Sequence, residues 1–378
     1  MKYNQLKKFI KTTSLFIFFL FISSQQSVRS DNVYMLGHSL VNFDLPAMFD
    51  GLANDANISH EYAVQVGIGA NLNYNWNNYS STQGDPYTIE LPKGIYDAFI
   101  MTEAVPLLNH TTWSETDVYL ANFYNYAKTH NSNTNVYLFE TWHCTDSGTP
   151  AGCEWDDNDG MPWRDRLDSD LAIWEGLVND FNTASNGDML IVPGGQAMAL
   201  LYDDIAAGTT PDLTSINDVF SDNIHLTDIG NYYMACVYFA CIYGQSPEGL
   251  TNQTYNQWGG AYNVPSIELA TRLQQLAWQT VINYPLSGVS LSTATGNIHV
   301  DDTGITVFPN PVDHIFTITG LLGSYQIEII DTAGVTYETL TGTDTIAINT
   351  EDLPVGLYYI RITQNGNPIC SIEKILKM

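Results

Sequence analysis

The chain has 378 residues, of which 44% are hydrophobic, and its formal net charge is -28. This length can accommodate two domains with cores of their own. So acidic a surface repels phosphate backbones and anionic lipid headgroups, which disfavours nucleic-acid and membrane-surface partners and suits a neutral or weakly charged substrate.

The first 30 residues have the features of an export signal. Five of the 13 basic residues lie here, no acidic residue does, and an apolar run at residues 14–22 follows the lysines. This order is typical of a secretory signal peptide. The run is too short to favour a helix that spans the membrane. A short membrane anchor is the alternative to a signal peptide. We expect a signal peptide at residues 1–30 and no stable membrane span.

Residues 31–284 alternate between short apolar runs and longer amphipathic ones. The expected strands are 33–36, 62–66, 98–101, 136–139 and 189–192. The expected helices are 45–55, 115–129, 168–181, 226–243 and 267–282. Apolar strands separated by helices predict an α/β fold with a five-stranded parallel sheet. In such sheets, ligands bind at the carboxyl ends of the strands.

The composition changes after residue 284. Residues 285–303 are rich in Ser, Thr, Gly and Asp and read as a linker. From 304 to 378, strand-like alternation recurs at 305–308, 315–318, 325–330, 345–348, 357–363 and 369–375. Short strands separated by turns predict a small C-terminal β-sandwich.

Three polar residues suggest acyl-transfer chemistry. Ser39 follows the first strand directly, where its hydroxyl would lie at the sheet edge and its amide near a helix N-terminus. Asp222 precedes His225 by three residues, so His225 could take the serine proton while Asp222 fixes the tautomer of the ring. Read singly, each has a structural alternative: a turn serine, a helix cap and an exposed loop histidine.

Gly37-His38-Ser39-Leu40, with Asp222-x-x-His225 far downstream, resembles the SGNH (GDSL-like) hydrolase superfamily over roughly residues 33–245. The resemblance implies a flavodoxin-like three-layer α/β/α sandwich and a serine hydrolase with Ser39, Asp222 and His225 as its triad. Such chemistry needs no cofactor and no metal. Ser39 lacks the Gly-x-Ser-x-Gly elbow of the α/β-hydrolases, which disfavours that alternative.

The resemblance also implies an oxyanion hole built from three donors. These are the Ser39 amide, a glycine amide after the second strand and an asparagine side chain after the third. The glycine corresponds to Gly67 or Gly69, and we choose Gly69 because it precedes a turn. Glu103 stands at the asparagine position. An ionised carboxylate there would repel the oxyanion unless it is protonated or turned toward another partner.

Four further side chains near the site are candidates for substrate contact. Thr141 and Trp142 follow the fourth strand, Gln196 follows the fifth, and His38 precedes the serine in place of the aspartate usual in the family. Trp142 could stack on a sugar ring. A core tryptophan and a helix-capping glutamine are equally compatible with the sequence.

Cys144 and Cys153 bracket a loop rich in Gly, Pro and Asp, which predicts a disulfide in an oxidising compartment. Cys236 and Cys241 lie in an apolar helical stretch and are expected to be buried thiols. The acidic run at 154–160 invites a calcium interpretation but lacks the EF-hand spacing, so we expect a solvated loop and no metal site.

The last domain carries its own motifs: Val307-Phe308-Pro309-Asn310-Pro311-Val312, Asp331-Thr332-Ala333-Gly334, Leu353-Pro354-Val355-Gly356 and Lys374-Ile375-Leu376-Lys377. They resemble the type IX secretion (Por) C-terminal sorting domain of Bacteroidetes. This implies passage across the outer membrane, the type IX machinery as partner, and a secreted or cell-surface location. The alternative is a carbohydrate-binding β-sandwich, but the strands show no regular aromatic platform.

Taken together, these features predict a secreted esterase that hydrolyses O-acyl esters, chiefly O-acetyl groups, on polysaccharide. The alternative from another class is a non-catalytic glycan-binding protein on a degenerate SGNH fold, which Glu103 motivates. A lipase or thioesterase is a further alternative, disfavoured because no long apolar lid is visible in the sequence.

Overall fold

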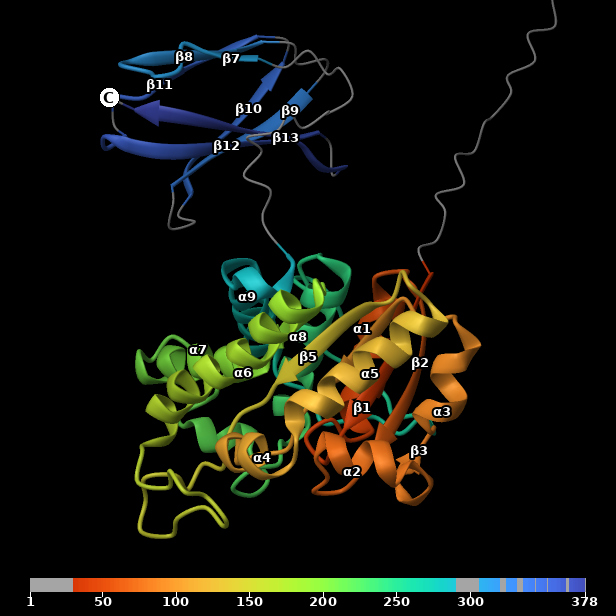
Figure 1. The fold of residues 1–378 in the computed structure, drawn as a ribbon. Helices are drawn as coiled ribbons and strands as arrows, with labels where there is room; N and C mark the ends of the chain where they lie inside the picture. Colours follow the sequence, from red (N-terminus) through yellow and green to blue (C-terminus); the bar gives the residue numbers. More distant parts are fainter. Residues whose placement is uncertain are drawn as a thin grey trace, which may run out of the picture. The chain divides into compact units, whose positions relative to one another are not determined.

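The structure is a computed structural model that describes residues 30–289, 306–319, 324–331, 336–343, 345–351, 353–364 and 367–377. Almost all of the predicted signal peptide and most of the predicted linker lie outside the described residues. The chain divides into two compact units between residues 291 and 292 (Figure 1). Each unit is described by itself.

The first unit is built on a mainly parallel sheet with the strand order β3-β2-β1-β4-β5-β6. The five parallel strands are β1 (Ser30–Gly37), β2 (Ser59–Val66), β4 (Ala98–Met101), β5 (Asn135–Glu140) and β6 (Leu190–Pro193). All five were predicted. The edge strand β3 (Gln83–Gly84) pairs antiparallel with β2 and was not, because two residues carry no alternation. The strand order reverses between β1 and β4, which is where ligands bind in open sheets of this kind.

Helices cover both faces of the sheet. Along β1, Val33 and Met35 belong to one buried cluster, and Tyr34 and Leu36 belong to the other, as the two-residue period of a strand requires. The first cluster includes α1 (Asp44–Asp55), α7 (Gly194–Ala206), α8 (Asp228–Tyr243) and α9 (Ile267–Asn283). The second includes α5 (Thr116–His130) and most of α6 (Trp163–Ser185), which lie in front of the sheet in Figure 1. The fold is therefore the expected three-layer α/β/α sandwich.

The helix α8 shows how local signals and burial act together. Its cap is Thr227, whose hydroxyl accepts from the Gly230 amide, and it ends at Gly244 in the left-handed conformation. Nearly every side chain between them is buried, so tertiary packing rather than an amphipathic stripe stabilises it. The part of the chain described by the structure contains no helix with the length and apolarity needed to cross a membrane.

Several shorter elements were not predicted. They are the helices α2 (Leu72–Asn77), α3 (Tyr87–Glu90), α4 (Leu107–Trp113) and α7, and the 3-10 helices Tyr79–Ser81, Leu91–Lys93, Ile216–Val219 and Pro285–Ser287. The helix α7 begins with Gly194 and Gly195, whose low intrinsic helix propensity hides it in the sequence. α4 matters for the site because it follows β4 at the same edge as Ser39.

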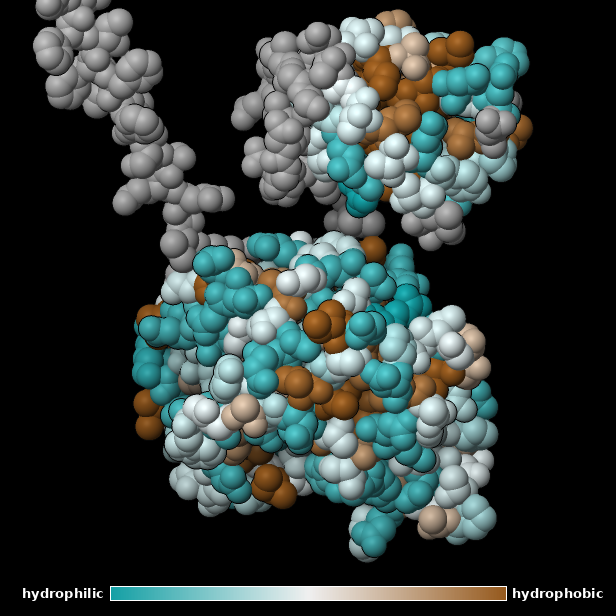
Figure 2. Space-filling view, turned by 180° about the vertical axis from the view of Figure 1, so that it is seen from behind, coloured by the Kyte–Doolittle hydropathy of each residue, from teal (hydrophilic) through white to brown (hydrophobic). Residues whose placement is uncertain are grey.

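The second unit contains two antiparallel sheets, ordered β10-β9-β12-β13 and β11-β8-β7. Their strands are β7 (Thr306–Phe308), β8 (Ile315–Thr319), β9 (Ser324–Asp331), β10 (Thr336–Thr343), β11 (Ile346–Asn349), β12 (Gly356–Gln364) and β13 (Asn367–Lys377). Phe316, Ile327 and Ile360 are fully buried in the shared core. β10 was missed because its threonines and glycine obscure the alternation. Figure 2 shows hydrophilic and hydrophobic residues interspersed over the visible surface of both units.

Candidate active site

Ser39 lies in a tight turn that follows β1 directly. The amides of Val41 and Asn42 both donate to the His38 carbonyl, at 3.0 and 3.3 Å, and this closes the turn. The Asn42 side chain then accepts from the first amides of α1, at 2.6 and 2.9 Å. Ser39 therefore sits at the carboxyl edge of the sheet, as expected, but a full turn precedes α1, so its amide is not at the helix N-terminus.

Asp222 and His225 lie in a second turn, just before α8. One Asp222 oxygen accepts from the amides of Ile224 and His225, at 2.8 and 2.7 Å. The other oxygen lies 2.7 Å from the His225 Nδ1. Burial alone would raise the pKa of Asp222, but the hydrogen bonds from His225 and Ile224 lower it overall. The aspartate is thus held ionised beside the ring.

The two turns meet at the hydroxyl of Ser39. The His225 Nε2 lies 2.9 Å from the Ser39 Oγ, although 186 residues separate them along the chain. Because Asp222 accepts from Nδ1, Nε2 is left as the acceptor for the serine proton. The side chains of His225 and Asp222 are 43% and 52% exposed, so a substrate can approach from solvent.

The two candidate glycines after β2 have different environments. The Gly67 amide donates to the Gly37 carbonyl at 2.9 Å and is not available to a ligand. Gly69 is exposed, has φ +63°, and its amide has no hydrogen-bond partner within the described ranges. A positive φ of this kind favours glycine. Of the two, Gly69 is the one that can still offer its N–H.

Glu103 is fully buried and turned toward protein donors. Its carboxylate accepts from the Leu72 amide at 3.2 Å, the Ala104 amide at 2.7 Å and the Thr116 hydroxyl at 2.7 Å. Burial raises the pKa of Glu103 to about 7. A carboxyl group that serves as acceptor for three internal donors, one of them at the start of α2, does not replace the missing asparagine as an oxyanion donor. This corrects its assignment to the oxyanion hole.

His38 is buried and serves the turn rather than a substrate. Its Nδ1 accepts from the Leu40 amide at 3.3 Å, so Nε2 carries the proton and donates to the Glu103 carbonyl at 3.0 Å. Burial is the main cause that lowers the pKa of His38 to about 4, and the charges of His110 and His225 lower it further. The ring is therefore neutral and ties the serine turn to the end of β4. The prediction that His38 contacts the substrate is wrong.

The three other expected substrate contacts are also internal. Trp142 is 0% exposed, and its Nε1 donates to the Ile224 carbonyl at 2.7 Å. Thr141 is buried as well. Gln196 bonds through its main chain and side chain to Glu140, both at 3.2 Å. The interpretation of Trp142 as a core residue is confirmed, and buried Trp142 and Thr141 are not available to contact a sugar. Gln196 lies within α7 and bonds to Glu140, so it does not cap that helix, which has no side-chain cap.

Two residues that were not expected at the site flank it. Asn71 caps α2 and donates through Nδ2 to the Ser114 hydroxyl at 2.9 Å. His110, on α4, lies 3.4 Å from the same amide nitrogen and close enough to His38 to affect its pKa. No signal in the sequence marks His110, because the helix that carries it was not predicted.

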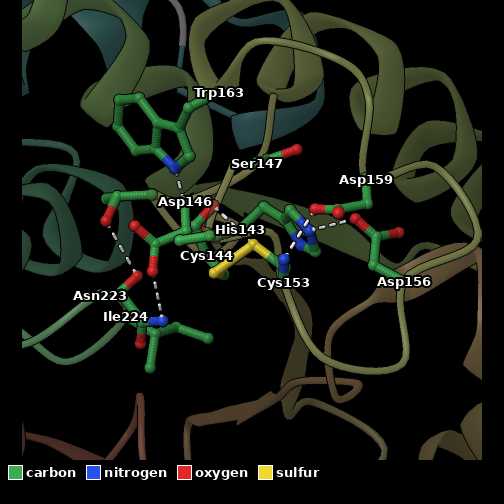
Figure 3. Close-up of a disulfide and its surroundings, with 12 residues drawn as sticks. His143, Cys144, Asp146, Ser147, Cys153, Asp156, Asp159, Trp163, Asn223 and Ile224 are labelled. Carbon is green, nitrogen blue, oxygen red and sulfur yellow. Dashed lines mark hydrogen bonds and ion pairs between the residues drawn. A yellow bond between two sulfur atoms is a disulfide. The ribbon is translucent and has the colours of Figure 1, made fainter. Parts of the chain in front are cut away.

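Cys144 and Cys153 form a disulfide, with 6.0 Å between their Cα atoms (Figure 3). In the acidic loop that follows, the Asp156 carboxylate is buried and lies 2.8 Å from both His143 and Arg166. The expectation of a wholly solvated loop is therefore wrong for Asp156. The described residues contain no group of three or more His, Cys, Asp or Glu able to hold a metal ion. Cys236 and Cys241 are free and buried.

Residues 306–377 match the family model described as secretion system C-terminal sorting domain. The second unit is thus a sorting domain, as its motifs indicated. No curated protein matches the chain.

Three solved structures are similar to parts of the chain. A DUF4886 family protein from Bacteroides uniformis is 14% identical, with a TM-score of 0.49, over 68% of this chain and 96% of that one. A protein described as a GDSL-like lipase, from Parabacteroides merdae, is 15% identical, with a TM-score of 0.36, over 55% and 93%. A carbohydrate esterase family 3 protein from Talaromyces cellulolyticus is 12% identical, with a TM-score of 0.36, over 57% and 97%. Likeness at this level does not identify an activity.

Proposed function

We propose that the chain is a secreted serine esterase of the SGNH type that hydrolyses O-acyl esters, chiefly O-acetyl groups, on polysaccharide. The observation that carries the proposal is the continuous hydrogen-bonded line from the Ser39 hydroxyl through the His225 ring to the Asp222 carboxylate. A serine, a base within hydrogen-bond reach and a third group that orients the base are the features of an activated nucleophile.

In this mechanism, the Ser39 Oγ attacks the ester carbonyl while its proton passes to the His225 Nε2. Asp222 stabilises the imidazolium that forms, and the amides of Ser39 and Gly69 donate to the oxyanion. When the intermediate collapses, the carbon–oxygen bond to the leaving alcohol breaks, and His225 gives its proton to that alcohol. Water then attacks the acyl-serine with His225 again as base, which releases the carboxylic acid and restores the hydroxyl. Each step uses side chains of this chain alone.

The nature of the substrate is supported by charge. With a formal net charge of -28, the protein repels anionic polymers, whereas a neutral acylated glycan meets no such barrier. The exposure of His225 and Asp222 fits a large substrate that docks from solvent. Leu72, Ala104 and Thr116 hold the Glu103 carboxylate, so its charge is not directed at the oxyanion. The missing asparagine donor is the feature that still favours a non-catalytic glycan-binding protein.

The proposed export route uses an N-terminal signal peptide and the C-terminal sorting domain. We propose a signal peptide at residues 1–30, the hydrolase domain at 31–284, a linker at 285–303 and the sorting domain at 304–378. The match of residues 306–377 supports recognition by type IX secretion machinery and delivery to the cell surface or beyond. A disulfide between Cys144 and Cys153 is consistent with an oxidising compartment.

Hydrolysis tests the proposal directly. The wild-type protein should hydrolyse p-nitrophenyl acetate and release acetate from acetylated xylan oligosaccharides, and Ser39→Ala should abolish both. Ser185→Ala is the matched control, because Ser185 is exposed at the end of α6 and its hydroxyl bonds only to the Phe181 carbonyl of the same helix. Hydrolysis that survives Ser39→Ala would overturn the proposal. Glycan binding without turnover, unchanged in His225→Ala, would favour the non-catalytic alternative.

A further inference from the structure

The segment that follows β5 holds the backbone of the Asp222–His225 turn. Trp142 donates from its indole to the Ile224 carbonyl at 2.7 Å. The Thr145 amide donates to the Asn223 carbonyl at 2.7 Å. The Asn223 side chain donates in turn to the Asp146 carboxylate at 2.8 Å. Two carbonyls and one side chain of the turn are thus held from outside it, and Figure 3 shows the Asp146 carboxylate directed toward Asn223.

These contacts bear on the two residues that connect Asp222 to His225. The Ile224 amide also donates to Asp222, so Ile224 is fixed on both sides of its main chain. Because the side chains of His225 and Asp222 are 43% and 52% exposed, packing around their own atoms restrains them little. Their geometry therefore depends on the backbone of Asn223 and Ile224, and that backbone depends on the segment after β5.

Cys144, which forms the disulfide with Cys153, lies between Trp142 and Thr145 in that segment. Other contacts attach the same loop to the domain. The Trp163 indole donates to the His143 carbonyl at 2.7 Å, and the Ser147 hydroxyl donates to the Met161 carbonyl at 2.7 Å. Figure 3 shows the disulfide close to Asp146 and to Asn223 of the turn. The covalent bond closes the short loop that carries Thr145 and Asp146.

We propose that this disulfide-closed loop positions the catalytic turn, with Asp146 as a positioning residue, so that turnover depends on the oxidised state of Cys144 and Cys153. The inference rests on the proposed esterase function and deepens it. A dithiol reductant would donate two electrons and two protons, convert the disulfide into two thiols and itself become a disulfide. The opened loop would then hold Asn223 less firmly, and the His225 ring would lose its alignment with Ser39.

A pair of substitutions at Asp146 tests the positioning role. Asp146→Ala removes the acceptor for Asn223, and we expect kcat to fall roughly tenfold with KM unchanged, since small displacements of a catalytic group cost this much or more. The pH–rate profile should also change, because His225 is the group displaced. Asp146→Asn should restore kcat, since its carboxamide oxygen can accept the same bond. Asp157→Ala is the control: Asp157 is exposed in the acidic loop that follows Cys153 and bonds only to Asn109, at 3.2 and 3.5 Å.

Reduction tests the role of the disulfide. Dithiothreitol, and separately the double variant Cys144→Ser/Cys153→Ser, should lower kcat by a similar factor, and reoxidation should restore the reduced wild type. Cys236 and Cys241 are already free thiols, so reduction does not change them. Circular dichroism monitors folding of each sample.

The outcomes separate the two proposals. Unchanged kcat and pH profile in both Asp146→Ala and the reduced wild type would overturn the positioning inference while leaving the esterase intact. An Asp146→Ala defect that Asp146→Asn does not rescue would also contradict it. Absence of Ser39-dependent hydrolysis in the oxidised wild type would overturn the esterase function itself, and the positioning inference with it.

Discussion

Asp222 accepts hydrogen bonds from both the main-chain amide and the ring of a single residue, His225, each at 2.7 Å and each through a different oxygen. The three-residue spacing makes this possible, because one turn of chain returns the amide to the carboxylate while the ring reaches its second oxygen. The ring is thereby held in one tautomer, with Nε2 directed to Ser39 at 2.9 Å.

Asp222→Asn tests this arrangement. The carboxamide oxygen can still accept from the two amides of the turn, but its NH2 group would face Nδ1 and favour the tautomer that protonates Nε2. Ser39 would then lose its base, and we expect kcat to fall by roughly 10³- to 10⁴-fold. Initial rates on p-nitrophenyl acetate measure this, with circular dichroism as a check of folding. A decrease smaller than about tenfold would contradict the role assigned to Asp222.

Gly69→Ala tests the oxyanion donor. A Cβ at this position meets nothing within 4 Å, so its effect comes from the φ of +63°, which costs a non-glycine residue about 1 kcal/mol. The loop can relieve this strain by moving the Gly69 amide away from the oxyanion. We therefore expect a clear decrease in kcat, while the free energy of unfolding falls by no more than about 1 kcal/mol.

Gly208→Ala is the matched control for that experiment. Gly208 has φ +70°, and a Cβ there would also meet nothing within 4 Å. It follows the C-terminal end of α7, away from the carboxyl ends of the strands where Ser39 lies. It should lose comparable stability and keep its activity. Equal activity in the two variants would remove Gly69 from the oxyanion hole.

Glu103→Gln tests whether the Glu103 carboxyl group takes part in catalysis or only holds the fold together. The carboxamide can accept from the Leu72 and Ala104 amides and donate to the Thr116 hydroxyl, so we expect activity within about threefold of wild type. Glu103→Ala leaves these buried donors unpaired and should lower the free energy of unfolding by about 2 kcal/mol or more. Thermal and urea unfolding give the stabilities. Loss of activity in the stable Gln variant would show that the carboxyl group takes part in catalysis.

The buried Glu140 should make stability depend on pH above neutrality. Burial raises its pKa from 4.5 to about 8. Between these values the unfolded chain has lost the proton while the folded chain keeps it, so the free energy of unfolding falls as pH rises, by at most about 1.4 kcal/mol per pH unit. Below pH 4.5 and above pH 8 this contribution is constant.

The clearest window is pH 7 to 8, because Glu103, with a pKa of about 7, contributes mainly below it. Urea unfolding of Glu140→Gln should lose the decline in this window, whereas the exposed control Glu61→Gln should keep it. An equal slope in wild type and Glu140→Gln would show that Glu140 is not the group responsible.

The elements that could be predicted from the sequence are those specified by the pattern of their own residues. The five parallel strands could be predicted because each contains a short, mainly apolar run that is largely buried, and α8 because it is a long apolar segment. The helix α7 could not, since Gly194 and Gly195 oppose a helix and only packing against the sheet stabilises it.

Within the site, the sequence predicted which residues lie near Ser39, but it did not predict which way their side chains point. Ser39, Asp222 and His225 were recognisable from spacing, and the structure brings them together. Glu103, His38 and Trp142 were expected to face a ligand, yet each bonds to a distant segment, at Leu72, at Glu103 and at Ile224. Those partners lie 31 to 82 residues away, and no local pattern specifies them.

The central claim is that Ser39 is a nucleophile activated by His225. Labelling with a fluorophosphonate probe, followed by mass-spectrometric mapping of the modified peptide, measures both properties at once, because only an activated serine reacts rapidly. The account predicts one adduct, on Ser39, which is lost in Ser39→Ala and strongly slowed in His225→Ala. An adduct on another residue, or a Ser39 adduct that forms equally fast without His225, would contradict it.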